Sequence, residues 1–190
     1  MKKKGGICRT CVPIASSSAR VWEGQMAATL QSWAEDDLIP IFTLWNKQNP
    51  MADPEQCGKY RADFLYEWAE GVLILEYDEY AHANRDKRCE LVRMAQMSLG
   101  YGGRPVFFIR YNPDAFKVAG KTLITARVAR EKELLKVLQA MIGDADYDHF
   151  LTIKYLFYNK PETSDDNFIQ TFKFPRLEDY EKWVDEVAPA

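Results

Sequence analysis

The hydrophobic and polar positions of this chain follow two different spacings. In four stretches the apolar side chains recur every three or four residues, which is the spacing of a helix that buries one face. These predicted helices cover residues 19–34, 89–99, 126–142 and 177–187. Between them lie short runs rich in β-branched and aromatic residues, which predict strands. The predicted strands cover residues 38–46, 62–68, 72–80, 105–111, 151–158 and 168–174.

The order of these elements intersperses strands with helices, which predicts an α/β or α+β sandwich, and we favour α/β. Strands 62–68 and 72–80 flank a turn at 69–71, so we expect an antiparallel hairpin there. Pro40 indicates that the run 38–46 is an edge strand or holds a strand start, because proline cannot donate a hydrogen bond to a sheet.

The composition is that of one globular domain. The chain has 190 residues, of which 47% are hydrophobic and 28% are charged, so it can bury a sizeable core. Its 10 Gly and 9 Pro are too few for a disordered or fibrous protein. We expect residues 1–18 to form a flexible basic arm. The single domain would then cover 19–190, with a core at 19–143 and a C-terminal extension at 144–190.

The same sequence argues against export and membrane insertion. No apolar run approaches the roughly 20 residues that a membrane span requires. The basic start MKKKGG is not followed by an apolar segment, so we expect no signal peptide. We therefore expect an intracellular protein whose four cysteines are thiols or metal ligands rather than disulfides.

The net charge of −3 is an average over unlike segments. Residues 81–130 carry 10 Lys or Arg and 3 Asp or Glu, a net charge of +7, whereas the segments on either side are acidic. The total argues against a protein that coats nucleic acid. The basic block predicts one positive face on an acidic body, and the alternative is an ordinary fluctuation of charge along the chain.

Acidic side chains gather where the predicted hairpin ends. In an alternating strand, Glu76 and Asp78 share the face of Val72 and Ile74, and an antiparallel hairpin brings Asp63 beside them. Buried carboxylates are costly unless they are paired or bind a metal, and clustered hard oxygens suit Mg²⁺ or Mn²⁺. His82, four residues past Asp78, is a candidate base or acid. The alternative is a set of solvated acids with a solvated histidine.

These residues belong to a longer pattern in residues 60–116, in which three parts stand out. They are Ala62-Asp63 on one strand, Glu76-Tyr77-Asp78-Glu79 with His82 on and after the next, and Arg93 followed by Arg110-Tyr111-Asn112-Pro113-Asp114. This pattern resembles the restriction-endonuclease-like (PD-(D/E)XK) nuclease superfamily, in its very-short-patch-repair-like branch with relatives in large DNA viruses. Two positions depart from the superfamily motif: Ala62 replaces the usual proline, and Asp78 replaces the usual lysine.

The resemblance implies a restriction-endonuclease-like core, with a central mixed β-sheet flanked by helices, and a Mg²⁺-dependent DNA endonuclease. It implies that Asp63 and Glu76 ligate one or two Mg²⁺ (or Mn²⁺) ions with the Tyr77 carbonyl, that Asp78 bridges a second ion or orients water, and that His82 moves a proton. Glu23 would be an additional acidic ligand, or else a solvent-exposed helix residue. The alternative is a catalytically inactive nuclease fold that binds nucleic acid or a protein partner, since the motif lysine is missing.

The resemblance also gives the basic block a DNA-binding role. The candidate phosphate contacts are Arg85, Lys87, Arg88, Arg93, Arg104 and Arg110. Arg93 and Arg110 have a second interpretation, as structural partners of the acids. Such nucleases often act as dimers, so a homodimer stays open, and a virus-encoded protein would work in the cytoplasm or nucleus of a host cell.

Two further features stand outside this pattern. Cys8 and Cys11 form a CxxC, half of a zinc knuckle, which Cys57 and Cys89 would complete if the arm folds back; free thiols are the default. The late aromatic residues are interpreted as core rather than as platforms for stacked bases. They are Tyr155, Phe157, Tyr158, Phe168, Phe172 and Phe174.

Overall fold

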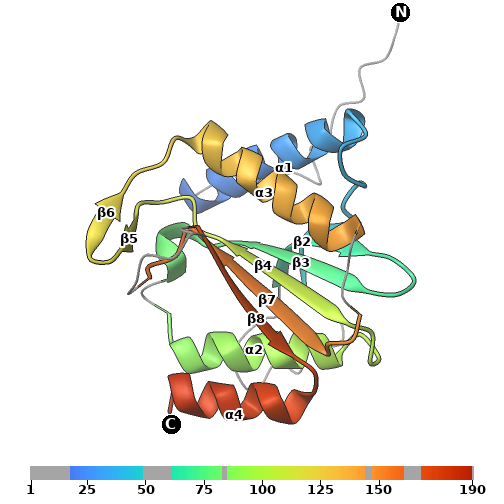
Figure 1. The fold of residues 1–190 in the computed structure, drawn as a ribbon. Coiled ribbons are helices and arrows are strands. Elements are labelled where there is room, and N and C mark those ends of the chain that lie inside the picture. The colour runs from blue at the N-terminus through green and yellow to red at the C-terminus, as the bar shows by residue number, and fades with distance from the viewer. Residues whose placement is uncertain (1–17, 49–60, 83–84, 144–146, 161–167, 190) are drawn as a thin grey trace, which may run out of the picture.

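The computed structural model describes residues 18–48, 61–82, 85–143, 147–160 and 168–189, which form three layers (Figure 1). The middle layer is a six-stranded sheet in the order β1-β2-β3-β4-β7-β8. The sheet is mixed: β3–β4 and β4–β7 are parallel, and the other pairs are antiparallel. The strands are β1 (Leu44–Gln48), β2 (Arg61–Glu67), β3 (Val72–Tyr77), β4 (Val106–Tyr111), β7 (Leu151–Leu156) and β8 (Ile169–Phe174).

Two helices cover each face of this sheet. Helices α1 (Ser18–Glu35) and α3 (Arg127–Gly143) lie on one face, and α2 (Lys87–Leu99) and α4 (Leu177–Val187) lie on the other (Figure 1). Each pair closes its own apolar core, with alternate residues of the strands between them. Leu73 and Leu75 of β3 point to the α1 and α3 side, and Val72 and Ile74 point to the α2 side. The predicted α/β class and the predicted mixed sheet with flanking helices are confirmed.

The central strands read as continuous apolar runs because helices bury both of their sides. All six residues of β3 and all six of β4 are buried. Where one of these positions is polar, its side chain is therefore forced into a closed environment. Glu76 on β3 and Arg110 on β4 are such positions, and they are 2% and 4% exposed.

The hairpin β2–β3 is confirmed, and its turn is tight. The amide of Trp68 donates to the carbonyl of Gly71 at 3.1 Å. A Cβ on Gly71 would lie 2.9 Å from a ring carbon of Trp68, so only glycine fits under that indole. The strand 72–80 was predicted too long, because β3 ends at Tyr77 and the chain turns away after Asp78.

Two other features of the fold differ from the prediction. The run 38–46 starts its strand only at Leu44, and β1 is the edge strand that Pro40 indicated. The short hairpin of β5 (Phe116–Val118) and β6 (Lys121–Leu123) was not predicted, since three-residue strands are too short to show a period. No helix among the described residues is both long and apolar enough to cross a membrane.

Candidate functional site

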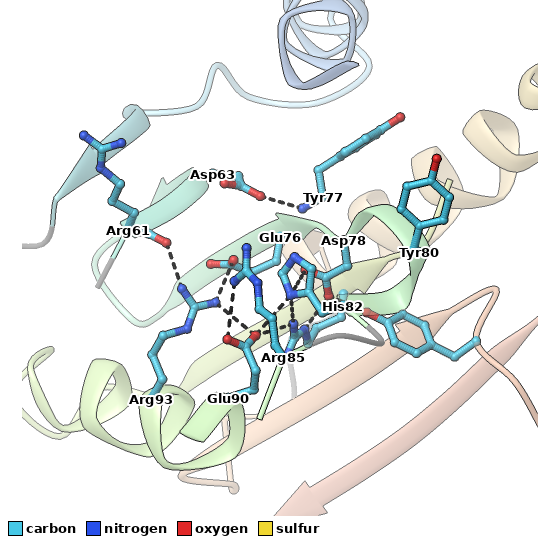
Figure 2. A network of polar contacts seen from close by, with 12 residues as sticks. Arg61, Asp63, Glu76, Tyr77, Asp78, Tyr80, His82, Arg85, Glu90 and Arg93 are labelled. Atoms are coloured by element: carbon cyan, nitrogen blue, oxygen red, sulfur yellow. Dashed lines mark hydrogen bonds and ion pairs between the residues drawn. The ribbon is translucent and has the colours of Figure 1, made fainter. Parts of the chain in front are cut away.

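The predicted acids lie where β3 leaves the sheet, above the first turns of α2 (Figure 2). Because β3 and β4 are parallel and in register, Tyr77 pairs with Tyr111 at this end, and the segments that follow both strands meet here. The 3-10 turn η1 (Glu79–His82) follows β3 and returns the chain towards α2. Residues far apart in sequence are thus assembled at the C-terminal ends of β3 and β4.

Asp63 lies beside Glu76, as the hairpin predicts. The pairing of β2 with β3 extends to Phe64 and Leu75, and Asp63 and Glu76 are the next residues beyond that pair. The Asp63 carboxylate accepts a hydrogen bond of 2.7 Å from the Tyr77 amide. Burial raises the pKa of Asp63 well above its usual range, and the negative charges of Glu76 and Glu23 raise it further. Glu23 on α1 thus lies close enough to act on this pair.

Glu76 is held by an arginine of the helix below it. Arg93 donates to one carboxylate oxygen of Glu76 at 2.9 Å and to the Arg61 carbonyl at 3.3 Å (Figure 2). Both side chains of this ion pair are buried. The other oxygen, Oε1, is buried without a hydrogen-bond partner. Glu76 therefore offers one oxygen to a further group while Arg93 fixes its orientation.

Asp78 is bound more completely than Glu76. Its Oδ2 accepts from Nε of Arg110 at 2.5 Å and from the hydroxyl of Tyr158, and its Oδ1 lies 3.1 Å from Nδ1 of His82. Asp78 is fully buried. Burial alone would raise its pKa, but the positive charges of Arg110 and His82 outweigh burial and lower it. The carboxylate thus stays ionised as an internal ion pair.

Glu90 on α2 joins these pairs into one network. Its Oε2 lies 2.8 Å from Arg110, 3.1 Å from His82 and 3.7 Å from Arg93, and its Oε1 lies 3.3 Å from Arg85 (Figure 2). Burial opposes ionisation, but the hydrogen bond from His82 and the charges of Arg93 and Arg110 hold the pKa of Glu90 far below its usual range. Sequence reasoning missed Glu90. Its available signal was the i, i+3 spacing to Arg93 on a predicted helix.

His82 reaches the network through an unusual backbone. Tyr80, Ala81 and His82 are consecutive and all left-handed, with φ of 55°, 51° and 50°. Each such residue costs free energy, so the surrounding contacts must hold the turn. The Tyr80 amide donates to Asp114 at 2.6 Å, and the Asp78 amide donates to the Tyr111 carbonyl at 2.8 Å. This left-handed backbone conformation brings the imidazole of His82 to Asp78 and Glu90.

The six predicted basic residues separate into four groups, of which Arg104 is the last. Arg93 and Arg110 are buried partners of the acids, which is the second of their two interpretations. Arg85 and Lys87 lie at the border of a pocket of about 450 Å³ that also contains His82, Glu90 and Arg110. Arg88 lies on α2 and pairs with Asp185 of α4 at 2.8 Å.

Arg104 does not lie near this site. It precedes β4, where Val106 pairs with Val72, and it pairs with Glu67 at 2.5 Å. Since the strands are parallel, this is the opposite end of the sheet from Asp78 and His82. The prediction that Arg104 contacts phosphates at the acidic cluster is wrong for that reason.

Of the cysteines, Cys89 has a free thiol in the first turn of α2, where Asp86 caps its amide at 2.7 Å. Cys8, Cys11 and Cys57 lie outside the described residues, so the zinc site stays a prediction. Within the described part of the chain, no three His, Cys, Asp or Glu side chains are grouped to hold a metal ion.

The acids fit a divalent ion only in part. Mg²⁺ is commonly held by one or two carboxylates and keeps several waters. Asp63, with its raised pKa, and Glu76, with its unpartnered Oε1, suit that role. Asp78 has Arg110 and Tyr158 on one oxygen. Its other oxygen, Oδ1, has no hydrogen-bond partner, like Oε1 of Glu76, but lies 3.1 Å from Nδ1 of His82.

No protein-family model matches this chain, and no curated protein or solved structure matches it either.

Proposed function

We propose that this protein is a metal-dependent DNA endonuclease in which Asp63 and Glu76 hold the ion. The observation that carries the proposal is the electrostatic state of Asp63. Burial and the negative charges of two neighbouring acids, Glu76 and Glu23, raise its pKa well above the usual range. A divalent ion would remove the repulsion between these carboxylates.

The arrangement of the core supports the finer fold, a restriction-endonuclease-like core. The resemblance implies an acid on each strand of a hairpin, then a helix that carries an arginine, then a strand that ends in a second arginine. In the structure, Asp63 and Glu76 lie on β2 and β3, Arg93 lies on α2, and Arg110 lies near the end of β4. These elements are neighbours in space as well as in sequence.

The side chains around the acids have distinct tasks in this proposal. Arg93 fixes one oxygen of Glu76, which leaves Oε1 for the ion. Asp78, Glu90 and Arg110 all contact Nδ1 of His82, so that its ring is oriented for proton exchange with water or with the leaving 3′ oxygen. The ion, when bound, would lower the pKa of water and neutralise charge on the scissile phosphate. The exposed Arg85 would contact a DNA phosphate.

A second candidate function is a nuclease fold that binds nucleic acid or a protein without cutting. The observation that favours it is the internal neutralisation of the acids. Arg93 already pairs with Glu76 and Arg110 with Asp78, and Asp78 stands where the superfamily has a lysine. In this case the ion pairs stabilise the fold and the site has no catalytic ion.

The test is cleavage of plasmid, linear and branched DNA with Mg²⁺ or Mn²⁺ by the wild type, Asp63→Asn and Glu76→Gln. We expect both variants to lose activity by about 100-fold or more, the lower range for lost catalytic groups. Glu67→Gln is the matched control, because Glu67 is an exposed acid at the far end of β2. It should cut like the wild type.

Two results would decide against cleavage by this protein. Equal nicking by all four proteins would indicate a contaminating nuclease. Binding of DNA by the wild type with no cleavage in either metal would support the second function. Titration of Mn²⁺ followed by calorimetry adds an independent readout, since Asp63→Asn should abolish binding and Glu67→Gln should not.

A further inference from the structure

The pocket beside the ion-pair network includes aromatic side chains to which neither proposed function gives a task. It is bordered by the turn at Ala81 and His82, the first turns of α2, the ends of β7 and β8, and α4. Its volume of about 450 Å³ is within the range of small-molecule sites. The segments 155–159 and 170–187, which follow the nuclease-like core in sequence, supply half of its lining residues.

One wall of the pocket is a continuous row of aromatic rings. Tyr155 contacts Tyr158 at 4.9 Å between ring centroids and Phe172 at 5.9 Å, and Phe172 contacts Trp183 at 5.0 Å. All four rings line the pocket and each is only partly buried. The sequence-based interpretation of Tyr155, Tyr158 and Phe172 as core is thus incomplete, because their rings also line the pocket. Neighbouring rings meet at 74°, 86° and 43°, so a flat aromatic ligand would stack on one ring face and meet the edges of neighbouring rings.

Another part of the lining is positively charged. Arg85, Lys87 and Arg110 line the pocket, against one carboxylate, Glu90. Arg110 is buried and is paired with Asp78 as well as Glu90, so it keeps the charge of Glu90 compensated. Arg85 and Lys87 are exposed at the border, where they can meet an anion from solvent.

Two side-chain amides complete the lining. Asn159 and Gln170 line the pocket, and the side-chain amide of Gln170 donates to the backbone carbonyl of Asn159 at 3.2 Å, while Oδ1 of Asn159 accepts from the Lys117 amide at 2.7 Å. Gln170 is paired with Tyr155 across β7 and β8, and Phe172 is two residues further on the same face of β8. An amide therefore stands next to the aromatic row, where it can hydrogen-bond the edge of a flat ring.

We infer that this pocket binds a nucleotide, with the base against the aromatic row and Gln170, and the phosphate at Arg85 and Lys87. A flat ring with hydrogen-bonding edges and an attached anion matches all three parts of the lining. The ligand is either a free mononucleotide or one nucleotide of a single strand. The inference does not depend on cleavage, since none of the proposed metal ligands lines the pocket.

The experiment is calorimetric titration of the full-length protein in EDTA with four ligands. These are thymidine 5′-monophosphate, thymidine, ribose 5-phosphate and the oligonucleotide dT8. We expect saturable binding of the nucleotide that is about tenfold tighter than binding of thymidine or of ribose 5-phosphate, because one lacks the phosphate and the other lacks the stacked base. Binding of dT8 about tenfold tighter than the monophosphate would identify the strand as the ligand source; equal binding would identify the free nucleotide.

The variants separate the pocket from general attraction to the basic face. Arg85→Gln with Lys87→Gln should weaken nucleotide binding about tenfold, and Trp183→Leu should weaken it similarly. Lys182→Gln is the control, since Lys182 is an exposed cation beside Trp183 that does not line the pocket. Circular dichroism checks folding, and if Trp183→Leu unfolds, Gln170→Leu replaces it. No binding of either thymidylate ligand, or equal binding by the pocket variants and the wild type, would overturn the inference. Because the titrations are made in EDTA, nucleotide binding is measured without a metal ion. This outcome is therefore distinct from a failure of the nuclease proposal.

Discussion

The ion pair between Asp78 and Arg110 allows a quantitative test of how this site is built. The perturbation is a double-mutant cycle of Asp78→Asn, Arg110→Met and both together. Arg110→Met removes the cation that donates to Asp78 at 2.5 Å and leaves the carboxylate in the core. Asp78→Asn keeps the shape and an acceptor for Tyr158 while it removes the negative charge.

The expected magnitude follows from burial. The Asp78 side chain is fully buried and that of Arg110 is 4% exposed, so neither charge can be solvated when its partner is lost. Breaking such a buried pair costs about 3–5 kcal/mol, a large share of a typical stability of about 5–15 kcal/mol. We expect Arg110→Met to lower the free energy of unfolding by an amount in that range. Asp78→Asn should lower it less, by about 2–3 kcal/mol, because Arg110 keeps its ion pair with Glu90. The double variant should cost clearly less than the sum.

The assay is urea denaturation of the four proteins at pH 7 and pH 4. The folded protein lowers the pKa of Asp78, so its stabilisation is present above the unfolded pKa of about 3.9 and is lost as the pH falls through the lower folded value. In Arg110→Met the pKa of Asp78 in the folded protein should rise. Protonation of Asp78 at pH 4 would then remove the unpaired buried charge and restore part of the lost stability. The penalty of Arg110→Met should therefore be larger at pH 7 than at pH 4.

Two results would refute this reasoning. A penalty of less than about 1 kcal/mol for Arg110→Met would mean that His82 and Tyr158 suffice to hold the charge, or that the pair is solvated. Strict additivity of the single variants at pH 7 would mean that the two side chains do not interact in solution.

Three further predictions concern stability and use the same denaturation assay. Asp63→Asn should stabilise the metal-free protein at pH 7 by about 1 kcal/mol, because the folded state raises the pKa of Asp63; the gain should vanish below pH ~4, and no gain at pH 7 would contradict the electrostatic argument. Gly71→Ala should lower the free energy of unfolding by about 1–3 kcal/mol, because its Cβ would clash with Trp68. The control is Gly24→Ala in α1, whose Cβ meets nothing within 4 Å; it should leave the free energy of unfolding unchanged or raise it by up to about 1 kcal/mol. Ala81→Gly should raise the free energy of unfolding by about 1 kcal/mol, because glycine adopts the left-handed backbone at φ 51° without strain. A lower free energy of unfolding would show that the Ala81 side chain makes contacts that outweigh this strain.

The hairpin and its acids illustrate what local patterns can predict. The alternation of β3 placed Glu76 and Asp78 on the face of Val72 and Ile74, and the turn at 69–71 brought Asp63 to Glu76. Both inferences need only the two-residue period of a strand and the antiparallel pairing of neighbouring strands. They succeeded because all the residues involved, from Asp63 to Asp78, lie within 15 positions of one another along the chain.

The partners of these acids were less accessible to such reasoning. Arg104 and Arg110 are six residues apart and look alike in sequence, yet one lies at each end of β4. The parallel pairing of β3 with β4 sends Arg110 to the acids and Arg104 away from them. Tyr158 reaches Asp78 only because β7 joins the sheet next to β4, and no pattern near Tyr158 indicates that position.

The sequence by itself determined the elements, the faces of the strands and the acidic hairpin, because periodicity and turn residues act over a few neighbours in the chain. The tertiary structure decided which charges are neutralised, how far the pKa values of Asp63 and Asp78 move in opposite directions, and that late aromatic residues border a pocket beside His82. The physical reason is that charge pairing and desolvation depend on distances between distant segments, and only the order of strands in the sheet sets those distances.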